Sequence, residues 1–114
     1  MPREKADPSR GQVMTHVSDY WPRQENLYTL SASATLATAF GAALSTEGGA
    51  VLINNESSNT INISVDATTA TASNFQLAAG KAITIYGGET RLGKIRLFAA
   101  SSSAVSLMEF EVIC

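Results

Sequence analysis

Residues 50–66 read AVLINNESSNTINISVD, and this stretch decides the fold class. It begins with a continuous apolar run, residues 50–53, which is typical of a strand buried inside a sandwich. Residues 54–59 follow as a turn, because Asn and Ser tolerate left-handed backbone or bond their own main chain. Beyond the turn, Ile61, Ile63 and Val65 alternate with polar residues and are expected to face inward from a second strand.

The same strand-and-turn pattern fills the rest of residues 27–114. Apolar side chains alternate with hydroxyl side chains from Tyr28 to Leu36, and Ile83 and Ile85 mark a further strand. Roughly seven short strands at intervals of about 8 to 12 residues predict an all-β domain, either a small β-sandwich or a jelly-roll-like fold.

One segment of this domain fits two structures. In residues 34–44 the spacing of Leu36, Phe40 and Leu44 is also that of one helix face, and Gly41 does not decide between helix and strand. We assign a strand here.

The last two strands are expected to form a hairpin across residues 100–103. The register of this hairpin places Lys94 opposite Glu109 and Ile95 opposite Met108. Because the apolar residues of the final strand change parity, a β-bulge is expected near Leu107 and Met108.

Length and composition exclude several classes of protein. A chain of 114 residues has room for one domain, and 45% hydrophobic with only 16% charged residues is typical neither of a disordered chain nor of a helical bundle. The formal net charge of −2 argues against nucleic acid and membrane surfaces as partners. The N-terminus lacks the apolar stretch of a signal peptide, so we expect a protein made in the cytoplasm.

The first 26 residues differ sharply from the rest. All three prolines lie there, together with half of the chain's 8 basic residues, and the apolar residues show no helical or strand period. We therefore predict an extended N-terminal arm, residues 1–26, with a reach on the order of 85 Å. An arm without a core of its own is expected to bind a partner chain or a second copy through its apolar and aromatic side chains, namely Val13, Met14, Val17, Tyr20 and Trp21.

Residues suited to catalysis or metal binding are few. The only histidine, His16, lies in the arm, and the only cysteine, Cys114, is the last residue. Neither has the neighbours that a nucleophilic or metal site requires. No catalytic residue, cofactor or metal ion is expected.

Glu109 and Glu111 are a carboxylate pair on one strand. They lie two residues apart and so face the same way, as in a glycoside hydrolase site. We favour a simpler interpretation, in which Lys94 and Arg96 of the neighbouring strand pair with them as solvent-facing charges.

The stretch from Val51 to Ile61 resembles small β-proteins encoded in the structural gene clusters of tailed bacteriophages. Those proteins often have an apolar strand, Asn-Asn, a Ser/Asn turn, and then Thr-Ile with alternation. The resemblance continues through Phe75 to Gly80 and the segment from Ile95 to Val112, so it spans about residues 27–114.

This resemblance implies a non-enzymatic component of the virion. The expected role is that of a capsid decoration or cement protein, which stabilises the shell by bridging neighbouring major capsid subunits. The arm would be the anchor, and contacts between copies through the arm are expected. The alternative is a recognition module of a tail fibre or baseplate, with residues 54–59 and 67–74 as its binding edge.

Overall fold

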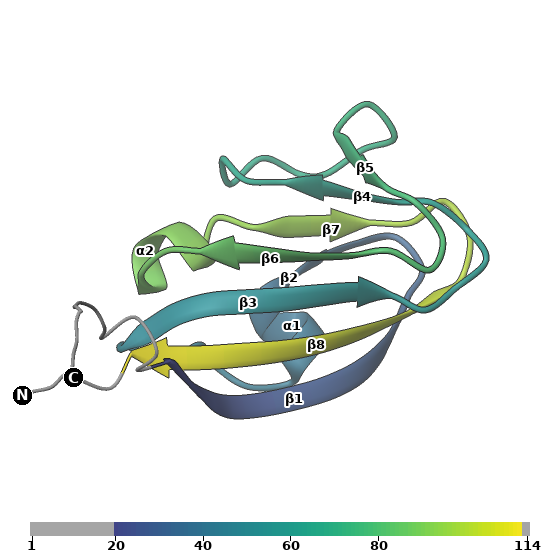
Figure 1. Ribbon diagram of the computed structural model, residues 1–114. Helices are drawn as coiled ribbons and strands as arrows, with labels where there is room; N and C mark the ends of the chain where they lie inside the picture. The colour runs from purple at the N-terminus through teal and green to yellow at the C-terminus, as the bar shows by residue number, and fades with distance from the viewer. Residues whose placement is uncertain (1–19, 113–114) are drawn as a thin grey trace, which may run out of the picture.

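The computed structural model describes residues 20–112 as two antiparallel sheets that pack face to face (Figure 1). Sheet A has the strand order β1-β8-β3-β6, and sheet B has the order β2-β7-β4-β5. The strands are β1 (Tyr20–Leu30), β2 (Ser33–Thr35), β3 (Gly48–Asn55), β4 (Ile61–Ser64), β5 (Phe75–Leu77), β6 (Ala82–Tyr86), β7 (Arg96–Phe98) and β8 (Ser103–Val112), and the helices are α1 (Leu36–Phe40) and α2 (Glu89–Leu92). Eight strands in two sheets connected in this way form a jelly roll, which confirms the predicted fold class.

The hydrophobic core lies between the two sheets. Val51, Ile53 and Val105 point into it from sheet A, and Ile61 and Leu97 from sheet B; all five are buried. Alternate residues of each strand therefore face outward, and they form the two outer faces of the sandwich.

Residues 36–40 form a short helix, so the strand expected there was wrong. The Thr35 hydroxyl accepts a hydrogen bond from the Thr38 amide at 3.1 Å, which caps the first turn. Gly41 ends the helix in a left-handed conformation, with φ of 75°, and its amide donates to the carbonyl of Ala37. These two caps fit the helical alternative within residues 34–44.

The predicted final hairpin is also wrong. Strand β7 pairs with β2 and β4 in sheet B, whereas β8 pairs with β1 and β3 in sheet A. The segment between them carries the chain from one sheet to the other, so Glu109 lies opposite Gln24 and Val51 instead of Lys94.

The bulge predicted at Leu107 and Met108 is absent from β8, whose inward and outward positions alternate from Ser103 to Phe110. The register shifts fall in the neighbouring strands, between Pro22 and Gln24 and between Gly48 and Ala50. The apparent change of parity arose because the outward positions of β8 are themselves apolar.

The predicted arm boundary needs a correction at its C-terminal end. Residues 20–26 belong to β1, so the boundary after Asn26 falls inside a strand of the sandwich. Pro22 is compatible with this strand because β1 is an edge strand with a register shift beside the proline. Residues 1–19, which include Val13, Met14, Val17 and His16, lie outside the described part of the chain.

Candidate protein-docking surface

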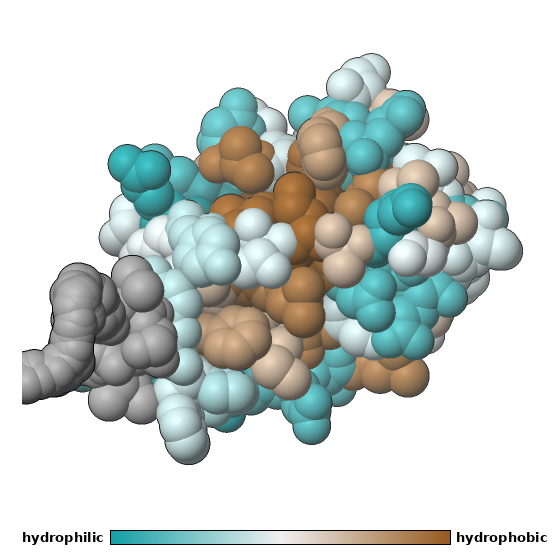
Figure 2. Space-filling model, viewed as in Figure 1, coloured by the Kyte–Doolittle hydropathy of each residue, from teal (hydrophilic) through white to brown (hydrophobic). Residues whose placement is uncertain are grey.

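The outer face of sheet A, called the A face below, is largely apolar. Ala50 lies between Phe110 and Tyr86 in one cross-strand row, and Leu52 lies between Met108 and Thr84 in the next. Figure 2 shows apolar side chains gathered over the middle of the molecule and polar side chains around them. Among residues 20–112, Glu25 is the only charged residue that lines the hollows of this face.

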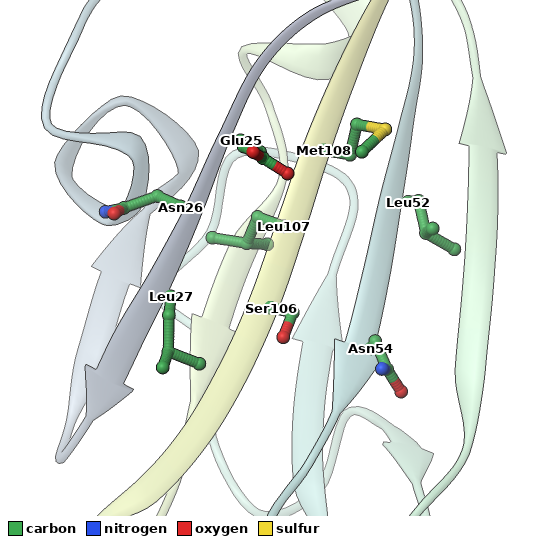
Figure 3. A pocket seen from close by; sticks show the side chains of 8 residues that line it. All are labelled: Glu25, Asn26, Leu27, Leu52, Asn54, Ser106, Leu107 and Met108. Carbon is green, nitrogen blue, oxygen red and sulfur yellow. The ribbon is translucent and has the colours of Figure 1, made fainter.

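Two shallow hollows meet on the A face at Leu52. The larger, of about 450 Å³, lies among side chains from β1, β8 and β3 (Figure 3). The smaller, of about 250 Å³, lies at the aromatic end of the face. The A face is lined by Tyr20, Glu25, Leu27, Ala50, Leu52, Asn54, Thr84, Tyr86, Ser106, Met108 and Phe110.

Tyr20 and Trp21 were predicted to bind a partner together, but β1 directs them to opposite sides. Tyr20 lies on the A face, where its ring centroid is 5.6 Å from that of Tyr86. Alternation along the strand turns Trp21 to the other side of sheet A, at the end of the strand, where 63% of its surface is exposed. The two residues therefore mark two different surfaces.

On sheet B, the outward positions of the central strand β4 are covered by the chain itself. Residues 65–74 form a loop over β4, and Asn62 Nδ2 donates to the Asn74 carbonyl at 3.1 Å. The Ser64 hydroxyl donates to the Asp66 carboxylate at 3.0 Å. Asn62 and Ser64 are both buried as a result, although they point away from the core. The loop covers β4, whereas Ser33 of β2 and Gln76 of β5 remain exposed.

Glu109 is completely buried at the inner side of β8 and is held by three donors. Its Oε1 accepts from Arg23 Nη1 at 2.9 Å and from Gln24 Nε2 at 2.7 Å, and its Oε2 accepts from the Ser45 amide at 2.9 Å. The Arg23 guanidinium compensates the charge of this carboxylate, which allows it to remain in the interior. The expected solvent-facing pairing with Lys94 and Arg96 was therefore wrong.

The Glu109 cluster acts as a structural brace. It ties β1 at its register shift to the segment between α1 and β3, where the Ala43 carbonyl also accepts from Arg23 and Gln24. Glu111 extends the cluster by accepting from the Ser45 hydroxyl at 2.9 Å. The sequence held a signal for this arrangement, since Glu109 shares its parity with Val105 and other inward residues of the last strand.

The two segments of the alternative binding edge are positioned differently. The turn at residues 54–59 follows β3 of sheet A, whereas residues 67–74 follow β4 and pass back over it to the start of β5 in sheet B (Figure 1).

Within residues 20–112, no group of three or more His, Cys, Asp or Glu side chains is placed to hold a metal ion. No helix of this part of the chain is long and apolar enough to span a bilayer.

No protein-family model matches the chain, and no curated protein or solved structure matches it significantly. The fold and surface define an all-β sandwich in which sheet B has a partly self-covered outer face and sheet A has an apolar one.

Proposed function

We propose that this protein is a non-enzymatic structural component of a virus particle, a decoration or cement protein that bridges neighbouring major capsid subunits. The observation that carries the proposal is the start of β1, where Trp21 is exposed on an edge strand that is itself firmly attached to the sandwich. The N-terminal region, residues 1–26, is its anchor.

The brace behind Trp21 supports a binding role for this residue. Arg23 and Gln24, two and three residues further along, are fixed by Glu109. An aromatic side chain on a fixed backbone loses little conformational entropy when it docks, so more of its buried area contributes to affinity. Trp is also the residue type most enriched among interface hot spots.

The fold is compatible with this role by analogy. Jelly rolls occur in viral capsid domains, although they also occur in lectins and enzymes, so the analogy supports the proposal without identifying the partner. A cement protein stabilises a shell by adding buried area across subunit joints. Many weak contacts on one particle then act together through their high effective concentration.

The test is reconstitution on particles assembled without this protein. Full-length chain and the Trp21→Ala variant are added at matched concentrations, and bound copies per particle are counted. We expect Trp21→Ala to lower the affinity about 30-fold, which corresponds to about 2 kcal/mol. Phe75→Ala is the matched control, because Phe75 is an aromatic residue of similar exposure, 56%, on sheet B.

Equal occupancy of wild type and Trp21→Ala would overturn the anchoring role. A wild-type copy number in the tens or fewer would instead favour a tail-fibre or baseplate component. Deleting residues 1–26 is a poor substitute for the point variant, because the deletion removes part of β1 and with it the braced end of sheet A.

A further inference from the structure

We infer that the A face is a self-association surface and that its partner is the A face of a second copy of this chain. This inference concerns a different side of the molecule from Trp21 and does not depend on the proposed function. It starts from a difference between the central strands of the two sheets: within residues 20–112, a loop covers the outward side chains of β4 in sheet B, whereas no segment covers Leu52 of β3 in sheet A.

The charge distribution favours a second copy over a partner of different chemistry. Leu52, Met108 and Phe110 lie on the two central strands, whereas Glu25 lies on the edge strand β1. A partner selected by charge would require complementary charges on this face, and the centre of the face has none. Glu56 lies beside the face, where its carboxylate accepts from Asn54 and Ser106. A second A face is equally apolar at its centre, so the contact brings no charge there.

The size of the face is sufficient for a dimer. The strands of sheet A have 11, 10, 8 and 5 residues, which at about 3.4 Å per residue and about 4.8 Å between strands give a face of roughly 550 Å². Two copies would then bury about 1,100 Å² together, which is in the range of weak, reversible interfaces. A reversible dimer with a dissociation constant in the micromolar range is therefore expected.

The geometry also places one residue near the symmetry axis. Leu52 lines both hollows and belongs to β3, a central strand of sheet A. In any two-fold contact that covers the whole face, the Leu52 side chains of the two copies lie close to each other. Like charges introduced at this position must therefore repel across the axis, and opposite charges must attract.

The experiment is sedimentation of the full-length chain over a range of concentrations. Wild type is expected to dimerise, and Leu52→Lys and Leu52→Glu are each expected to raise the dissociation constant at least tenfold. Mixing these two variants should restore the dimer as a heterodimer. Gln76→Lys is the matched control, because Gln76 is an exposed strand position on sheet B and gains the same charge.

Thr84→Glu provides a second variant, because Thr84 is an exposed position that lines the smaller hollow of the face. It should also weaken the dimer, while circular dichroism remains that of wild type. A wild type that is monomeric at every attainable concentration would overturn the inference. So would a dimer unaffected by Leu52→Lys. Trp21→Ala should leave the dimer intact, so the two proposals can fail separately.

Discussion

The central strands of the two sheets differ in the polarity and the coverage of their outward side chains. On sheet B, Asn62 and Ser64 are polar and are buried under residues 65–74, with hydrogen bonds to that loop. On sheet A, Leu52 and Phe110 are apolar, and no described segment covers them. Polar side chains are covered by a segment that makes specific hydrogen bonds to them. Apolar side chains are stabilised by any surface of matching shape that removes them from water, because the hydrophobic effect is not directional.

This difference indicates where each face contributes free energy. Hydrogen bonds to the loop act within one chain, so they contribute to folding. The apolar area of the A face contributes to the free energy of association when a second surface covers it. Substitutions on the two faces should consequently affect different measurements.

The largest effect is expected at the brace that holds β1, and hence Tyr20, on the A face. Glu109→Ala removes the acceptor for Arg23, Gln24 and the Ser45 amide. Because the Arg23 side chain is 36% exposed and regains some hydration, we expect a loss of about 2 to 3 kcal/mol in the free energy of unfolding. Chemical denaturation of both proteins measures this loss.

Glu111→Ala is the control on the same strand and should cost less than about 1 kcal/mol, because Glu111 is only partly buried. Equal losses for the two variants would show that the brace does not depend on the buried carboxylate. Pairing with β8 would then be sufficient to hold the β1 residues of the A face in place.

A smaller effect is expected on the self-covered face. Asn62→Ala leaves the carbonyls of Ala72 and Asn74 without their donor, so we expect a loss of about 1 to 2 kcal/mol and faster proteolysis within residues 65–74. Gln76→Ala, an exposed neighbour across the strand pair, should change stability by less than about 0.5 kcal/mol. If Asn62→Ala were equally neutral, the loop would be held by something other than these bonds.

The sequence predicted the fold class because alternation is local, as residues 50–66 show. It did not predict how strands pair, because the residues between β7 and β8 that suggest a hairpin also suit a crossing between sheets. Pro22 was taken as a sign of an arm, but it marks a register shift in the edge strand β1.

The candidate site was predicted only in part. Exposed aromatic residues near the start of the chain were identified, but their separation onto two sides of β1 follows from pairing with β8, which no local pattern specifies. The A face was missed because Met108 and Phe110 were attributed to a bulge. Apolar residues on both faces of one strand were the signal that could have revealed it.

The smallest expected effect concerns pH and the loop over sheet B. Hydrogen bonds from the Thr68 side chain, the Ser64 hydroxyl and the Thr68 amide stabilise the charged form of Asp66 and lower the pKa of this carboxyl below its usual range. Because the pKa is lower in the folded than in the unfolded chain, the stabilising contribution is present at neutral pH. It is lost as the pH falls through the folded value, below about pH 4.

Titration of the Asp66 carboxyl by NMR should therefore give a midpoint below that of an unstructured peptide. Proteolysis of the loop by an acid-active protease should increase over the same pH interval. Asp66→Asn should abolish this increase while leaving the A face and its association unchanged, because Asp66 lies in the loop over sheet B, on the other side of the sandwich. An ordinary midpoint for Asp66 would show that the loop covers sheet B without help from this charge.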